Sequence, residues 1–260
     1  MRSSITGSVS AFTSQSVFIG RSLRHSLRNV DALIMAIVLP IMLMLMFTYI
    51  FGGAIDPTGD YVNYVVPGII LLTAGYGSAS TAVDVNQDMT GGIIDRFRTM
   101  PIASHGVVIG HIVSSLARNL LATGIVILVA MLVGFRPSAG LLDWIFALAL
   151  IALFILALTW LFAGIGLVAG SPAAASGYGF ILLFLPYLSS AFVPTETMPS
   201  WLHGVADHQP ITPVIETIRG LLTSTPIGND AWIAVGWCLL ILAVAFAWSV
   251  RSFRRLAGRR

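Results

Sequence analysis

The chain has 260 residues, of which 57% are hydrophobic and 10% are charged, and its formal net charge is +3. A soluble globular domain carries about 25% charged residues, so this composition excludes an ordinary soluble protein and indicates one that lies within a membrane. All 14 basic residues are arginine. Because a Walker A phosphate loop and a lysine Schiff base both require lysine, neither chemistry can reside on this chain.

Residues 9–28 are predicted to form a helix that lies in the membrane surface. Phe12, Ile19, Leu23 and Leu27 recur at helical spacing, and arginines occupy the other faces. This amphipathic pattern is typical of an interfacial helix. The alternative, an ordinary basic flank that only sets orientation, stays open.

Six apolar stretches are each long enough for the roughly 20 residues that a helix needs to cross the hydrocarbon core. They predict an all-α, polytopic membrane protein organised as a single transmembrane domain over residues 1–260. The predicted spans are residues 30–51, 64–85, 112–134, 144–168, 173–193 and 231–250.

The distribution of arginine predicts the orientation of these spans. Arginines precede the first span, lie between the second and third, and follow the sixth, whereas only Arg136 and Arg219 lie on the opposite side. Since positively charged loops are retained in the cytoplasm, both termini are expected there.

A short cytoplasmic helix is predicted at residues 91–100, because glycines precede it and Pro101 ends it. Its faces differ in character: Ile93, Phe97 and Met100 share an apolar face, and Asp95, Arg96 and Arg98 lie on the others. A helix of this length is marginal alone in water, so it needs a surface on which to pack.

The connection between the last two predicted spans is expected to form short extracellular helices over residues 195–225. Trp201 suggests an anchor at the membrane interface, and Thr212 with Pro213 is a helix-start signal. The second helix carries an apolar face with Glu216 and Arg219 directed away from it. We expect both helices to re-enter the outer leaflet as a lid, whose candidate residues are Trp201, Ile215, Ile218 and Leu222.

Soft and aromatic side chains in the spans are candidates for a path that accepts apolar substrates. The candidate pathway residues are Met42, Met46, Tyr76, Tyr178 and Phe184. Packing or lipid contact is the alternative for each of them, and it stays open.

Ionisable groups inside apolar segments are costly and point to function or to pairing. Only Arg118 lies clearly within such a segment, and we expect it to pair with Asp84 or Asp88 in a structural ion pair rather than a proton relay.

Neither a catalytic serine motif nor a zinc-protease motif is present, so no enzyme is expected. The extracellular groups His203, Asp207 and His208 lie near Glu196 in sequence, but their spacing matches no compact ligand set, and no metal site is expected.

Four stretches carry a resemblance to a known family: "RSLRHSLRNVDALIMAIVLPIMLMLMFTYIFGG", "VVPGIILLTAGYGSA", "DMTGGIIDRFRTMPIASHGVVIGHI" and "SSAFVPTETMPSWLHGVADHQPITPVIETIRGLL". The chain resembles the membrane subunit of an ABC type-2 exporter, similar to the permeases of doxorubicin-type antibiotic efflux systems. In that family the segment after the second span is a coupling helix docked on a separate ATPase subunit. The resemblance implies ATPase-coupling residues Asp88, Ile93, Asp95, Arg96, Phe97, Arg98 and Met100.

The resemblance also implies a function and partners. The chain would be the permease of an ATP-driven exporter of an amphipathic or hydrophobic substrate, a drug or a lipid-like molecule, in the bacterial plasma membrane. It would pair with itself or a similar permease, and ATP and Mg would bind the partner ATPase, with no cofactor on this chain. The alternatives are a proton-coupled carrier or channel, and a membrane scaffold that transports nothing.

Overall fold

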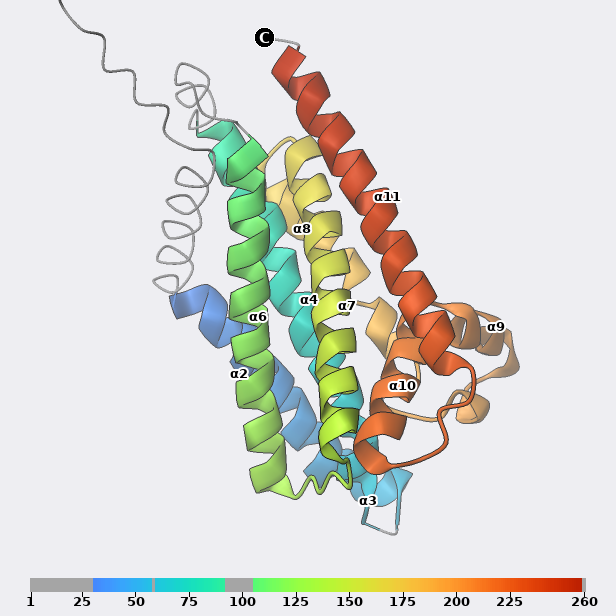
Figure 1. Ribbon diagram of the computed structural model, residues 1–260. Helices are drawn as coiled ribbons and strands as arrows, with labels where there is room; N and C mark the ends of the chain where they lie inside the picture. Colours follow the sequence, from blue (N-terminus) through green and yellow to red (C-terminus); the bar gives the residue numbers. More distant parts are fainter. Residues whose placement is uncertain (1–29, 58, 92–104, 259–260) are drawn as a thin grey trace, which may run out of the picture.

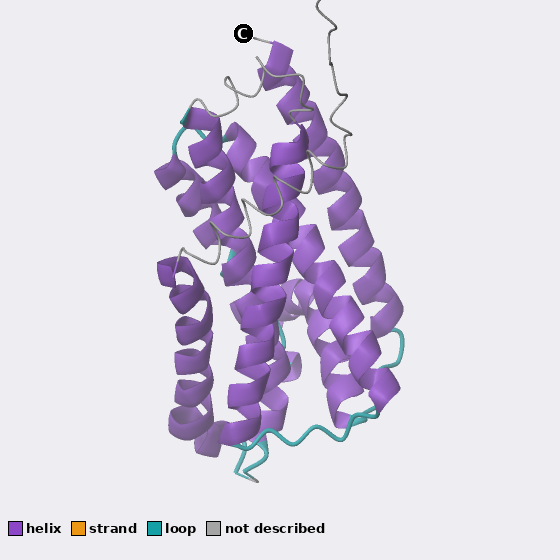
Figure 2. Ribbon diagram, turned by 60° about the vertical axis from the view of Figure 1, so that its left-hand side comes forward, coloured by secondary structure: helices purple, strands orange, loops and turns teal. Residues whose placement is uncertain are grey.

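A computed structural model of the chain describes residues 30–57, 59–91 and 105–258. Within these ranges all regular structure is helical, and the helices pack side by side as one bundle (Figures 1 and 2). The interfacial helix predicted at residues 9–28 lies outside the described residues. All of the helix predicted at 91–100 except Gly91 lies outside them too.

Five helical segments are long and apolar enough to cross a membrane: Ala36–Ile55, Tyr61–Thr90, Val108–Val133, Leu141–Val168 and Asp230–Phe253. The first comprises most of α2 (Val30–Met46), a π-helical turn η1 (Phe47–Phe51) and α3 (Gly52–Ile55). The others belong to α4 (Tyr61–Thr90), α6 (His105–Val133), α7 (Leu141–Val168) and α11 (Asp230–Gly258). They correspond to five of the six predicted spans and confirm an all-helical, multi-pass membrane protein.

The stretch predicted as one span at residues 173–193 is not a single helix, so the count of six is not confirmed. The chain forms α8 (Pro172–Leu182) and the short 3-10 helix η2 (Leu185–Leu188), and then turns without helix over residues 189–193. Pro186 cannot donate a backbone hydrogen bond, and the Ser189 hydroxyl donates to the Pro186 carbonyl at 2.5 Å. Pro186 therefore cannot continue α8, which ends four residues earlier at Leu182, and Ser189 lies where η2 ends.

α4 is the central helix of the bundle. It is buried along most of its length and contacts α2, α6, α7, α8 and α10 (Ile211–Thr223). The approach of α7 is close, because a Cβ atom added at Gly166 would lie 2.4 Å from the Ala82 carbonyl oxygen. At Gly77 an added Cβ would lie 1.6 Å from Asn119 Oδ1 of α6. Small residues thus set the spacing of these helices, as is common in membrane bundles.

Buried polar side chains join the same three helices. Thr81 donates to Ser115 at 2.8 Å, and Asn86 donates to the carbonyls of Gly166 at 2.9 Å and Ala169 at 2.7 Å. Hydrocarbon offers no hydrogen-bond partners, so these bonds fix how α4 is rotated against α6 and against the end of α7.

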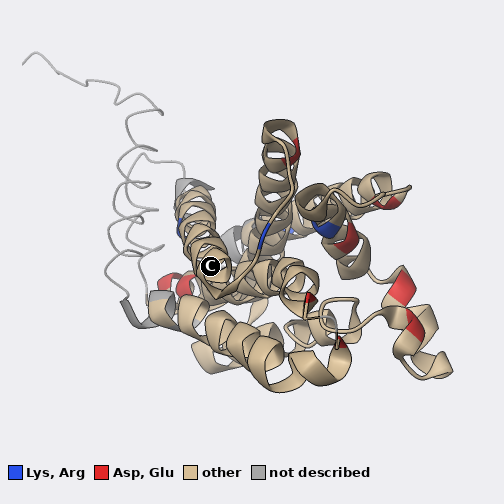
Figure 3. Ribbon diagram, turned by 90° about the horizontal axis from the view of Figure 1, so that it is seen from below, with Lys and Arg blue, Asp and Glu red and all other residues tan. Residues whose placement is uncertain are grey.

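The remaining helices lie near one end of the bundle. After η3 (Thr195–Thr197) and α9 (Ser200–His208), α10 lies beside the first half of α11 and beside α7, at the end opposite the C-terminus (Figure 1). Viewed from that end, few charged positions interrupt the described ribbon (Figure 3). The helices predicted within residues 195–225 are therefore present, and α10 is an internal helix of the bundle.

Candidate functional site: a cleft between α2, α4 and α8

A cleft of about 460 Å³ opens between α2 and α8, and side chains of α4 also line it. Its lining residues are Ala36, Leu39, Tyr76, Ala79, Ser80, Val83, Asp84, Gln87, Ser176, Phe180 and Leu183. The lining combines apolar and aromatic side chains with hydroxyl, amide and carboxylate groups. A cleft of this size and character can hold a small amphipathic molecule.

An aromatic cluster lies beyond the cleft, toward the end of the bundle that holds α10. The ring of Phe192 stacks on Phe47 of the π-helical turn at 4.2 Å between centroids, and on Tyr187 at 5.3 Å. Phe184 continues the row, 6.1 Å from Tyr187 and 5.1 Å from Phe180, which lines the cleft. The row thus runs from Phe180 on α8, in the cleft lining, to Phe47 on η1. π-helical turns such as η1 are frequent at functional sites.

The predicted pathway residues divide between these features. Tyr76 lines the cleft, and Phe184 belongs to the aromatic row. Met42 on α2 and Tyr178 on α8 are more than half exposed, and Met46 is partly buried. The structure therefore places Tyr76 in the cleft lining and Phe184 against Phe180 of that lining. Phe180, another aromatic residue of α8, lines the cleft as well.

The predicted ion pair of Arg118 is confirmed and lies at the wall of the cleft. Its guanidinium is 3.6 Å from Asp84 Oδ2 and donates to the Ser80 hydroxyl at 2.6 Å. One turn further along α4, Asp88 Oδ2 lies 2.9 Å from His111 Nε2. The two pairs join α4 to α6 just before the connection that contains residues 92–104.

Of the predicted coupling residues, only Asp88 lies in the described part of the chain. Its contact with His111 fixes the end of α4 from which the predicted coupling helix departs. The other six are Ile93, Asp95, Arg96, Phe97, Arg98 and Met100, and they lie outside the described residues, so their role stays a prediction.

The predicted lid residues differ in environment. Ile215, Ile218 and Leu222 are fully buried in the main hydrophobic core, whereas Trp201 on α9 is 76% exposed. The apolar face of α10 thus packs inside the bundle against α4, α7 and α11.

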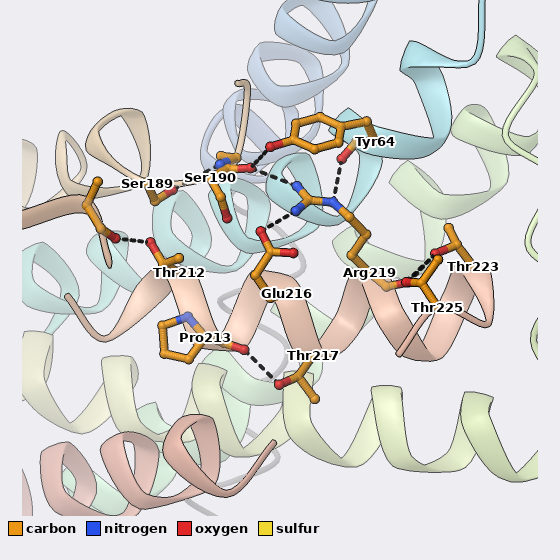
Figure 4. Close-up of polar contacts among 12 residues, drawn as sticks. Tyr64, Ser189, Ser190, Thr212, Pro213, Glu216, Thr217, Arg219, Thr223 and Thr225 are labelled. Carbon is orange, nitrogen blue, oxygen red and sulfur yellow. Dashed lines mark hydrogen bonds and ion pairs between the residues drawn. The ribbon is translucent and has the colours of Figure 1, made fainter. Parts of the chain in front are cut away.

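Arg219, predicted to lie off the apolar face of α10, does not lie at the surface of the bundle. The residue is buried, and its side chain bonds Glu216 and the backbone carbonyls of Tyr64 and Ser190 (Figure 4). A signal was available in the sequence, because an arginine between Ile218 and Leu221 on an apolar helix needs partners within the protein.

No group of three or more metal-ligating side chains occurs among the described residues. His203 Nε2 lies 2.8 Å from the Met198 carbonyl, and His208 Nδ1 lies 3.1 Å from the Gly204 carbonyl. Local backbone contacts therefore account for both histidines.

The fold and the cleft define a polytopic membrane protein with the features of a transport permease. Residues 15–223 match the family model described as ABC-2 type transporter. The chain belongs to the ABC-2 type transporter family.

Named relatives agree with this assignment. The chain is 32% identical over 224 residues to a daunorubicin resistance ABC transporter permease protein, DrrB1, of Streptomyces coeruleorubidus, covering 85% of this chain and 79% of that one. It is 26% identical over 227 residues to a probable doxorubicin resistance permease, DrrC, of Mycobacterium tuberculosis, covering 85% and 82%. A putative transport permease, ycf38, of Porphyra purpurea is 24% identical over 219 residues, covering 81% and 74%.

Proposed function

We propose that this chain is the permease subunit of an ATP-driven exporter and that the cleft between α2, α4 and α8 receives the substrate. The mixed lining of the cleft carries the proposal: Tyr76, Phe180 and Leu39 offer apolar surface, and Asp84 and Gln87 offer polar groups. Such a lining suits an amphipathic or hydrophobic molecule. The relatives named for daunorubicin and doxorubicin resistance support a drug as its class.

A second copy of this chain, or of a similar permease, would complete the pathway. The side chains of Tyr178, Phe180 and Ile181 on α8 are exposed, as is that of Phe184 just after it. Phe180 also lines the cleft. Lipid tails can cover the apolar side chains, but they offer no partners to the polar groups of the cleft, and a second chain could supply these. The proposed pathway therefore lies between two chains.

The energy would come from a separate ATPase, since this chain lacks the lysine that a phosphate loop needs. In this proposal the helix at residues 91–100 docks on the ATPase, with ATP and Mg bound there. The α4–α6 ion pairs would carry its movement to the cleft, because Asp84 both lines the cleft and pairs with Arg118.

Replacing Phe97 with alanine should separate ATP hydrolysis from export while leaving the permease inserted and dimeric. Aromatic residues dominate interfaces, and truncation of such an anchor costs about 2 kcal/mol or more. The measurements are co-purification with the ATPase and drug-stimulated ATP hydrolysis in proteoliposomes. The companion variant is Arg96→Lys with Arg98→Lys. If these arginines dock on the ATPase, lysine should weaken coupling, because an ammonium does not reproduce the hydrogen bonds of a guanidinium. If they only set the topology, lysine should serve equally well. Wild-type behaviour of both variants would remove the coupling assignment.

A proton-coupled carrier is the second candidate, favoured by the ionisable row Asp84, Asp88 and His111 along α4 and α6. All three lie toward one end of the bundle, whereas a relay needs groups at several depths. Export that requires the ATPase and persists with a protonophore would favour the ATP-driven proposal.

Both termini are proposed to lie in the cytoplasm of a bacterial cell, with the chain in the plasma membrane. In a variant with Cys238 replaced by serine, a cysteine at the exposed Thr225 should react with an impermeant thiol reagent added to intact cells. A cysteine at Ser104 should react only after the cells are opened. Labelling of Ser104→Cys in sealed cells would reverse the orientation.

A further inference from the structure

The non-helical segment after η2, residues 189–193, is here called the break segment. Its residues Ser189, Ser190, Ala191 and Phe192 are buried. At membrane depth, backbone groups outside a helix persist only where protein groups satisfy them. The break segment therefore needs hydrogen-bond donors from elsewhere in the fold.

Three such donors come from α4 and α10. The Ser190 carbonyl accepts hydrogen bonds from Arg219 Nη2 at 2.7 Å and from the Tyr64 hydroxyl at 3.0 Å. The Phe192 carbonyl accepts one from the Tyr61 hydroxyl at 2.7 Å. The segment is thus tied to two other helices by side chains alone (Figure 4 shows the bonds of Tyr64 and Arg219).

Arg219 is the residue that joins all parts of this arrangement. Besides its bond to Ser190, its Nε donates to the Tyr64 carbonyl at 3.2 Å, and its guanidinium lies 3.8 Å from the centre of the Tyr64 ring. Glu216, one turn earlier on α10, forms an ion pair with it. A planar guanidinium can serve these partners together, whereas a lysine ammonium has no such geometry.

The break segment is linked to the cleft by the aromatic row, which runs from Phe192 through Tyr187 and Phe184 to Phe180 in the cleft lining. Phe192 provides the ring between Phe47 and Tyr187, and Ala191 packs on α4 so closely that a Cβ added at Gly68 would lie 2.7 Å from the Ala191 carbonyl oxygen. Release of the segment from α4 would remove Phe192 from the aromatic row.

The closed arrangement leaves polar atoms without partners. Ser190 Oγ in the break segment and Gln209 Oε1 beside it are buried and form no hydrogen bond within the described chain. A buried polar atom without a partner raises the free energy of the arrangement that buries it. The hydrogen bonds from Arg219, Tyr64 and Tyr61 therefore have to outweigh this cost to hold the segment closed.

We propose that the break segment is the outer gate of the chain and that Arg219 is the residue that positions it closed. Movement of α10 would withdraw Arg219 from Ser190, free the segment from α4 and open the cleft toward the side that holds α10. The gate rests on the proposed function only in that the cleft is taken as the transport path.

The test uses the reactivity of a cysteine within the gate. In the full chain with Cys238→Ser, Ser190→Cys introduces a thiol in place of a buried hydroxyl that has no partner. Its rate of modification by a charged methanethiosulfonate is measured in lipid nanodiscs, without ATP or ATPase. We expect Arg219→Lys to raise this rate at least tenfold, and Tyr64→Phe, which removes one bond to the same carbonyl, to raise it less.

Matched controls separate a gate from general loosening. Arg136→Lys changes the exposed arginine of the α6–α7 connection, which bonds the Met131 and Phe135 carbonyls, and should leave the rate unchanged. A reporter cysteine at Thr123, buried in α6, should stay slow in every variant. Equal gains at Thr123→Cys and Ser190→Cys would overturn the gate, as would a rate within twofold of the parent for both Arg219→Lys and Tyr64→Phe.

The outcome is independent of the ATPase experiment. If Arg219→Lys does not fold, the labelling rate of Ser190→Cys in Tyr64→Phe tests the gate by itself, because phenylalanine keeps the ring under the guanidinium. Fast labelling together with wild-type coupling in Phe97→Ala would support the gate and remove the ATPase docking site. Slow labelling of Ser190→Cys together with uncoupling in Phe97→Ala would overturn the gate and support the ATPase docking site.

Discussion

Replacing Arg118 with methionine should lower the free energy of unfolding by about 3 kcal/mol, because it leaves the Asp84 carboxylate without its partner inside the bundle. The Arg118 side chain is 3% exposed and that of Asp84 is 18% exposed, so solvent screens the remaining charge only weakly. The Ser80 hydroxyl would lose its donor as well. Reversible unfolding in mixed detergent micelles measures the change.

The double variant Arg118→Met with Asp84→Asn should recover much of this loss, since it removes the unpaired charge and keeps both side-chain volumes similar. Asp84→Asn alone serves as the second arm of the double-mutant cycle. If the losses of the two single variants simply add in the double variant, the pair is not an interacting unit. The α4–α6 connection would then depend on packing.

Gly166→Ala should lower the free energy of unfolding by about 1–3 kcal/mol, although the change adds only one methyl group. The new Cβ would meet the Ala82 carbonyl oxygen at 2.4 Å, and this atom belongs to the backbone of α4 and cannot rotate away. Separation of α4 from α7 would also stretch the bond from Asn86 to the Gly166 carbonyl. The same unfolding measurement applies.

Gly124→Ala is the matched control for this prediction. Gly124 lies within α6 with no atom in 4 Å of its added Cβ, so alanine there should be neutral or raise stability by up to about 1 kcal/mol through its helix propensity. Equal effects at Gly124 and Gly166 would show that helix propensity, not close approach, governs both positions.

Hydropathy and spacing predicted most of the helical fold. The five long helices could be predicted from the sequence, because a continuous apolar run of about 20 residues matches the length that a helix needs to cross a bilayer. Hydropathy could not predict where α8 ends, since residues 173–193 are as apolar as the other spans. Its interruption depends on Pro186, which has no backbone N–H to donate four residues after Leu182, and a composition average does not register this.

The site was predictable in part, because pairing partners are set by tertiary contact. The single arginine in an apolar segment led to the Arg118–Asp84 pair, since an intramembrane charge must find a partner. For Arg219 the sequence predicted a position off the apolar face of α10, but it did not predict that the residue is buried. An amphipathic interpretation places charges in water, whereas here the helix lies inside the bundle, and the carbonyls of Tyr64 and Ser190 accept hydrogen bonds from the buried guanidinium. Tyr76 was selected as one aromatic among several, and only the cleft distinguishes it from Tyr178.

The shortness of α8 has a consequence for how the bundle can deform. Eleven residues rise about 16 Å, roughly half of a hydrocarbon core about 30 Å thick. In the described stretch between α7 and α11, no single helix is therefore long enough to cross the core: α8 and α10 are separate short helices, and the non-helical residues 189–193 lie between them. A junction of this kind can bend where a continuous helix cannot, so α8 and α10 can move separately while α7, a single helix of 28 residues that contacts both, stays straight.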